Sequence, residues 1–222
     1  QSGDTMIVTH PSMQTQKIFR TGLTSFTKSN FTFDTDAENV YQPYYKFANA
    51  TTTISASGTT GSVTLTTSAN HFTSAYVNVY LMIEDTTLLI TGFTSATQVT
   101  ATILGTLRKQ LIIDPFTTEN GTKVITVNDP LHGLANGASI TISGSNSIEG
   151  ISATDINGSK TISVLNEDTY TFTAGGSANA NNTAAGGGAA VFLTSANQVN
   201  TRWKEQTYSS IRGYPASSTF HD

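Results

Sequence analysis

The chain has 222 residues, a net charge of −4 and no cysteine, which excludes disulfides, thiolate metal sites and cysteine nucleophiles. Charged residues make up only 12% of the chain and form no basic stripe, so we do not expect a protein that binds nucleic acid. No apolar run approaches the roughly 18 residues that span a bilayer, and we expect no stable membrane insertion.

The composition predicts an all-β protein with very little helix. Thr, Ser, Asn, Ala and Gly dominate, whereas Leu, Glu and Lys, which favour helices, are scarce. Thr, Val, Ile, Tyr and Phe, which favour strands, are common, and no helical periodicity of useful length is present. The chain begins with Gln1 rather than Met, so we expect a processed chain or an excerpt of a longer one.

Residues 1–48 hold three expected strands. These are Met6–Thr9, Lys17–Arg20 and Phe31–Phe33. The pair His10-Pro11 ends the first strand, because proline lacks the N–H that a strand ladder requires.

Residues 49–108 predict a small barrel or sandwich of four or five strands. In SVTLTTS, Val63 and Leu65 fall on one face and the threonines on the other. The GTTG before this run predicts a hairpin turn. The run YVNVYLMI, residues 76–83, also alternates and is expected to form a strand.

Residues 109–191 predict a second β module. TKVITV, SITISG, KTISVL and TYTFTA are four strands with period two, and Asn120-Gly121 and Asn157-Gly158 are strong turn dipeptides. The stretch 175–190, rich in Gly, Ala and Asn, is expected to be a mobile loop. Residues 192–222 differ in character and contain Trp203 and the run RGYP.

The two ends together carry a resemblance. The start, GDTMIVTHPSMQTQKIFRTGLTSFT, with its pair His10-Pro11, resembles a segment of tail proteins of tailed phages. The end, WKEQTYSSIRGYPASSTFHD, resembles a later segment of the same proteins. The marks of this second segment are Trp203, Glu205, Arg212, Gly213, Tyr214, Pro215, Phe220 and His221.

In that family the two segments belong to a β-propeller-like platform, and small β modules are inserted between them. The resemblance therefore implies platform segments at 1–48 and 192–222 and inserted modules at 49–108 and 109–191. The second module, with His132-Gly133, is similar to the β half-domain of ubiquitin-activating enzymes.

The resemblance implies a virion tail component of the nozzle or tail-tube class in short-tailed phages. Such proteins form a ring with themselves, often of six copies, next to other tail proteins. DNA passes through this ring without specific binding. The location implied is the virion, and the activity is structural rather than enzymatic.

His132 invites a chemical interpretation, because it lies between turn signals just ahead of a strand. A metal ligand or general base would need partners, and only Asp129 lies nearby. We therefore expect a turn residue whose ring packs or bonds to the backbone. His10, His71 and His221 lie in unrelated contexts and are interpreted in the same way.

Two further groups of residues have competing interpretations. The run Asp34–Glu38 alternates acidic residues as a calcium loop does, but it lacks the glycine and distal glutamate, which favours a solvated acidic loop. Tyr41, Tyr44 and Tyr45 cluster around a proline, and they suit either a carbohydrate-binding platform or, as we favour, a tyrosine-packed domain junction.

The remaining singled-out residues have structural interpretations. Trp203 is expected to anchor a core or an interface, and Arg212 to pair with Glu205 or to cap a backbone turn. There is no Gly-x-Ser-x-Gly elbow or phosphate loop. We thus expect no enzyme and no cofactor, with host-surface glycan binding as the alternative function and a cell-wall or capsule hydrolase as the least supported one.

Overall fold

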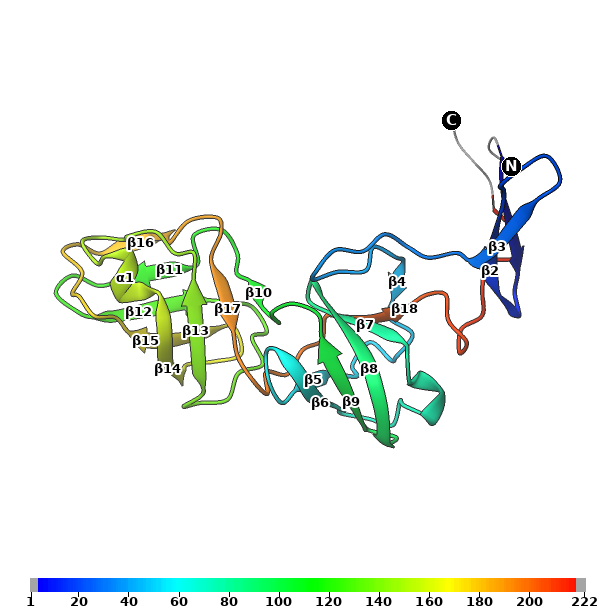
Figure 1. Cartoon of the computed structure of the whole chain (residues 1–222). Helices are drawn as coiled ribbons and strands as arrows, with labels where there is room; N and C mark the ends of the chain where they lie inside the picture. The colour runs from blue at the N-terminus through cyan, green and yellow to red at the C-terminus, as the bar shows by residue number, and fades with distance from the viewer. Residues whose placement is uncertain (1–3, 219–222) are drawn as a thin grey trace.

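The computed structural model describes residues 4–218, without the side chains of residues 183–185. Strands account for 44% of the chain and helices for 3%, which confirms the predicted all-β class. Three antiparallel sheets lie in a row, with an eight-stranded sheet at one end, a seven-stranded sheet in the middle and a three-stranded sheet at the other end (Figure 1).

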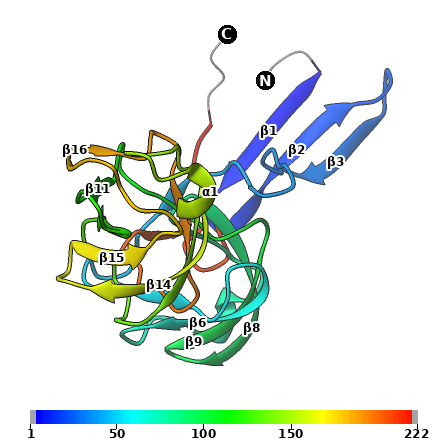
Figure 2. The ribbon, with the colours of Figure 1, turned by 90° about the vertical axis from the view of Figure 1, so that its left-hand side faces the viewer.

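The three-stranded sheet is formed by β1 (Thr5–His10), β2 (Met13–Arg20) and β3 (Phe26–Asn30) in that order. Every residue of β3 is exposed, and the sheet projects away from the rest of the chain (Figure 2). The prediction of a strand at Phe31–Phe33 is wrong, because the chain leaves the sheet after β3. The rings of Phe31 and Phe33 instead pack edge to face, with centroids 5.3 Å apart.

The seven-stranded sheet has the order β4-β18-β7-β8-β9-β6-β5. Its core includes Val63 and Leu65, which are 5% and 0% exposed, so the inward face predicted from SVTLTTS is confirmed. Its strands are β4 (Tyr44–Tyr45), β5 (Ile54–Ala56), β6 (Gly61–Thr67), β7 (Tyr80–Ile83), β8 (Thr86–Ser95), β9 (Gln98–Ile103) and β18 (Trp203–Gln206).

The alternating run at residues 76–83 is not one strand, contrary to expectation. A short 3-10 helix, η1 (Ser74–Tyr76), occupies its start, and β7 begins only at Tyr80. The reason lies at Asn78, whose φ of 69° falls in the left-handed region that a strand cannot use. This irregular backbone lets Tyr76 and Val79 both enter the core.

The eight-stranded sheet has the order β10-β17-β13-β14-β15-β12-β11-β16. Ile125, Val127, Ile140 and Ile142 are buried while their neighbours in sequence are not, so the period-two interpretation is confirmed. Its elements are β10 (Lys109–Gln110), β11 (Phe116–Thr118), β12 (Val124–Asn128), β13 (Ser139–Ser143), α1 (Ala153–Ile156), β14 (Gly158–Val164), β15 (Thr169–Thr173), β16 (Asn182–Gly186) and β17 (Phe192–Thr194).

The stretch 175–190 is not wholly a loop, because β16 lies within it and pairs with β11 at the edge of the sheet. The sheets also divide the chain differently from the expected boundaries. β17 belongs to the eight-stranded sheet and β18 to the seven-stranded sheet, since Leu193 and Trp203 fill their respective cores. The eight-stranded unit is thus inserted between β9 and β18. Within residues 4–218, no helix is long and apolar enough to cross a membrane.

Candidate functional site

A buried polar network surrounds the carboxylate of Glu205, which lies in β18 with 1% of its side chain exposed. His71 Nε2 is 2.9 Å from Glu205 Oε1, and Tyr76 Oη donates to Oε2 at 3.0 Å. Arg212 Nη2 donates to the same Oε2 at 2.8 Å and to Tyr76 Oη at 2.7 Å. The pairing of Arg212 with Glu205 is one of the two arrangements expected from the sequence.

The charges in this network compensate each other. Burial alone would raise the pKa of Glu205, but hydrogen bonds from His71 and Arg212 hold that pKa below its usual range. Burial and the adjacent carboxylate raise the pKa of Tyr76. Glu205 therefore stays ionised and Tyr76 stays protonated at neutral pH. A carboxylate that already accepts three hydrogen bonds is suited to holding the chain in place.

Trp203 anchors the same strand in the core of the seven-stranded sheet, where it is 1% exposed. Its Nε1 donates to the main-chain oxygen of Thr52 at 2.9 Å, and its ring meets the His71 ring edge-on at 5.1 Å. Lys46 Nζ lies 5.7 Å from the ring centroid and donates to three main-chain carbonyls, and burial lowers the pKa of Lys46. Of the two expected places for Trp203, it occupies the core.

His132 is 2% exposed, and both ring nitrogens bond to the main chain. Nδ1 accepts the N–H of Leu134 at 2.9 Å, so Nε2 carries the proton and donates to the oxygen of Asn166 at 2.9 Å. The ring also packs edge to face on Tyr170, with centroids 5.1 Å apart. In this tautomer neither ring nitrogen has a lone pair left for a metal or a substrate proton. The ring bonds to the backbone, as expected for a turn residue. Gly133 follows it with a φ of 61°.

A second buried ion pair was missed by the sequence reasoning. Lys109 Nζ lies 2.6 Å from Asp129 Oδ1, and these side chains are only 12% and 2% exposed. The other carboxylate oxygen of Asp129 and the Oη of Tyr170 are buried without a hydrogen-bond partner in the described structure. Burial and the nearby Asp129 raise the pKa of Tyr170. Lys109 lies in a strand and Asp129 just after another, and their separation in the sequence does not indicate that they pair.

The two end segments meet at Pro11 and Tyr214. The main-chain N–H of Tyr214 donates to the oxygen of Pro11 at 2.9 Å. Gly213 has a φ of 85°, and a Cβ there would lie 3.1 Å from the same oxygen, so both its conformation and its surroundings favour glycine. His10 Nδ1 accepts the N–H of Ser12 at 3.2 Å. Phe220 and His221 lie outside the described residues.

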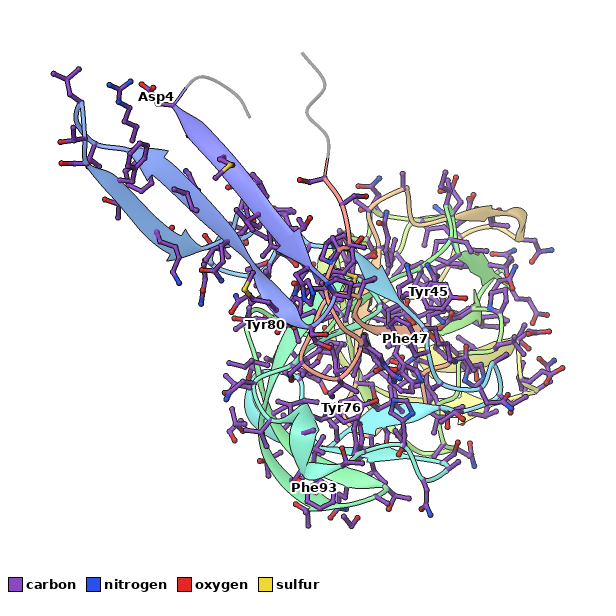
Figure 3. All side chains as sticks on the ribbon, turned by 90° about the vertical axis from the view of Figure 1, so that its right-hand side faces the viewer. Asp4, Tyr45, Phe47, Tyr76, Tyr80 and Phe93 are labelled. Atoms are coloured by element: carbon purple, nitrogen blue, oxygen red, sulfur yellow. The ribbon has the colours of Figure 1, made fainter. Side chains whose placement is uncertain are left out.

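Tyr41, Tyr44 and Tyr45 do not share one binding face. The hydroxyl of Tyr41 donates to Asp36, and Tyr44 is half-buried with its hydroxyl on the Val40 oxygen. Tyr45 is exposed and packs on Phe47, with centroids 5.0 Å apart (Figure 3). Neighbouring residues of a strand point to opposite faces, which separates Tyr44 from Tyr45.

The acidic run at residues 34–38 forms a turn around Asp36. Its Oδ1 accepts the N–H groups of Glu38 and Asn39 at 2.8 and 2.7 Å. The hydrogen bond from Tyr41 and those main-chain donors lower the pKa of Asp36. Within residues 4–218, no group of three or more His, Asp or Glu side chains is arranged to hold a metal ion.

A groove of about 790 Å³ lies where the three-stranded sheet meets the seven-stranded sheet and the C-terminal segment. Tyr80, at the start of β7, lies near the base of the projecting sheet in Figure 3. The groove was not expected from the sequence, because it is assembled from several separate segments. Among the described residues, its aromatic lining consists of Phe31, Phe33, Tyr80, Tyr208 and Tyr214.

Comparison with known proteins gives little guidance. No family model matches the chain, and no curated protein matches it. Among solved structures, the chain is similar to the phage phi92 endosialidase, with a TM-score of 0.35 and 14% identity. The similar region covers 85% of this chain and 34% of that chain, so the chain spans about a third of that protein. A TM-score this low assigns no shared fold.

Proposed function

We propose that the chain is a structural building block of a phage tail, of the nozzle or tail-tube class, which assembles into a ring around the path of the DNA. The observation that carries the proposal is the hydrogen bond between Pro11 and Tyr214. These two residues belong to the end segments that resemble this family. Their contact brings the two ends of the chain together, with the eight-stranded unit inserted between β9 and β18 of the seven-stranded sheet.

The projecting sheet supports self-assembly. Within residues 4–218, both of its outer strands, β1 and β3, have an unpaired edge. Leu23 and Phe26 are 88% and 67% exposed. A sheet with open edges and little core gains stability when a neighbouring chain covers it. The net charge of −4 also suits a conduit, because a wall that does not attract phosphate lets DNA slide without specific binding.

Light scattering and negative-stain electron microscopy of the purified chain test this proposal. We expect ring-shaped oligomers, and we expect the paired substitution Leu23→Asp and Phe26→Asp to dissociate them. Val124→Asp is the matched control, because Val124 is 46% exposed on the eight-stranded sheet and its variant should keep the rings. A chain that stays monomeric at every concentration, with no rings in the images, would contradict the proposal.

A further inference from the structure

We propose that the groove between the projecting sheet and the seven-stranded sheet binds a neutral oligosaccharide. Its volume of about 790 Å³ lies within the range of roughly 300–1,000 Å³ typical of small-molecule sites. The inference goes beyond the proposed structural role, and it does not depend on that role.

The lining chemistry selects the class of ligand. Among residues 4–218, none of those that line the groove is an Asp, Glu, Lys, Arg or His. An anionic sugar or a nucleic acid would require Arg or Lys, and a cationic ligand would require carboxylates or a charge-matched aromatic cage. A neutral ligand needs no opposite charge from the protein, so it is the class of ligand that suits this groove.

Aromatic rings and side-chain amides both line the groove, and sugars bind through these two kinds of group. The aromatic rings of Tyr80, Tyr208 and Tyr214 offer apolar faces against which the C–H faces of a sugar can pack. The side-chain amides of Gln14 and Asn78 make no hydrogen bond within the described residues, nor do the hydroxyls of these three tyrosines. They are therefore free to bond sugar hydroxyls, and an apolar occupant would leave them unsatisfied.

The groove is held open by bonds within the protein. Gln206 Oε1 accepts the N–H of Tyr80 at 3.1 Å, and its Nε2 donates to the oxygen of Tyr208. Tyr214, which also lines the groove, is held by the hydrogen bond from its main-chain N–H to the oxygen of Pro11. A ligand therefore meets walls that are already positioned, which reduces the entropy lost on binding.

A glycan array that carries neutral and acidic oligosaccharides, probed with the labelled 222-residue chain, identifies the ligand. Calorimetry with the best neutral glycan then measures the variants. We expect Tyr208→Ala and Gln14→Ala to weaken binding by about tenfold or more, in line with the loss of a packed ring or a polar contact. Tyr45→Ala is the control, because Tyr45 is 62% exposed outside the groove and its loss should leave affinity unchanged.

Thermal unfolding of each variant checks that the fold is kept, and Gln14→Ala serves this purpose well because Gln14 is an exposed residue of β2. Three results of the binding measurements would overturn the proposal. These are an array on which no neutral glycan binds, binding of acidic glycans alone, and equal affinity of the groove variants and the wild type. Crosslinking of Ser210→Cys to a second copy, with loss of glycan access, would also overturn it by showing a protein occupant.

Discussion

Arg212 Nη2 lies 2.8 Å from Glu205 Oε2, and this ion pair fastens the C-terminal segment to the buried end of β18. The guanidinium also lies over the ring of Phe47, 4.4 Å from its centroid. A single side chain thereby connects the segment that carries the run RGYP to the core of the seven-stranded sheet.

Removing Arg212 should therefore destabilise the protein strongly. In Arg212→Met, Glu205 keeps its charge in a buried site but loses its main cationic partner, and we expect the free energy of unfolding to fall by about 3 kcal/mol. Urea denaturation measures this. The control is Arg202→Met, because that side chain is 71% exposed and its Nε lies 3.6 Å from Glu84, so its loss should cost less than about 1 kcal/mol. Equal effects of the two substitutions would contradict the assigned role of Arg212.

The pH dependence of stability should distinguish Glu205 from Glu84. The pKa of Glu205 is lowered by folding, so its stabilisation is present above the ordinary value of 4.5 and is lost as pH falls through the folded pKa. Burial raises the pKa of Glu84 despite nearby Arg202, so its contribution has the opposite sign. That stabilisation is present below 4.5 and is lost as pH rises through the folded pKa.

Urea denaturation of the wild type, Glu205→Gln and Glu84→Gln between about pH 3 and pH 7 measures these contributions. The stability difference between the wild type and Glu205→Gln should shrink as pH falls below 4.5. Relative to the wild type, Glu84→Gln should become more stable as pH rises above 4.5. Curves that run parallel for all three proteins would show that neither carboxylate is linked to folding in this way.

His132 should behave as a neutral structural residue. We expect nitrogen NMR of its ring to report the tautomer with the proton on Nε2, because Nδ1 accepts a main-chain N–H. His132→Ala should cost about 2–4 kcal/mol, since it leaves two buried main-chain groups unsatisfied and opens a cavity. His10→Ala, at an exposed turn, is the control and should cost less than about 1 kcal/mol. A protonated ring at neutral pH would contradict the assignment.

Gly133 and Gly137 should respond differently to substitution. Both have positive φ, of 61° and 79°, so alanine is strained at either position. A Cβ at Gly133 would overlap the main-chain oxygen of Val199, whereas no atom of the described residues lies within 4 Å of one at Gly137. We expect Gly137→Ala to lower the melting temperature by a few degrees, and Gly133→Ala to lower it several times further or to prevent folding. Equal shifts would show that Val199 can move aside.

The regular strands were predictable from the sequence because each buries one face. Ile140 and Ile142 follow period two, and a one-residue shift would expose both. The same rule failed at residues 76–83, where the pattern alternates but the left-handed backbone at Asn78 interrupts it. It missed β16, because main-chain pairing with β11 organises a stretch whose sequence shows no alternation.

The candidate sites were predictable only in part, because they depend on contacts between distant segments. The sequence suggested that Arg212 could reach Glu205, but His71 and Tyr76 join them only once η1 has turned inward. The groove is lined by residues from several segments that are far apart in the sequence, so no local spacing of residues predicts it. Tyr41, Tyr44 and Tyr45 are close in sequence, yet their side chains are separated by strand geometry and by the bond from Tyr41 to Asp36.

The proposal that the chain is a phage tail protein is tested most directly by electron cryo-microscopy of virions produced from a genome that carries its gene, combined with mass spectrometry of the same particles. We predict that peptides of this chain are present and that its sheets repeat around the tail axis, with the projecting sheet formed by β1, β2 and β3 at the contact between neighbouring copies. Purified virions that lack the chain, or that carry it without a ring around the tail axis, would contradict the account.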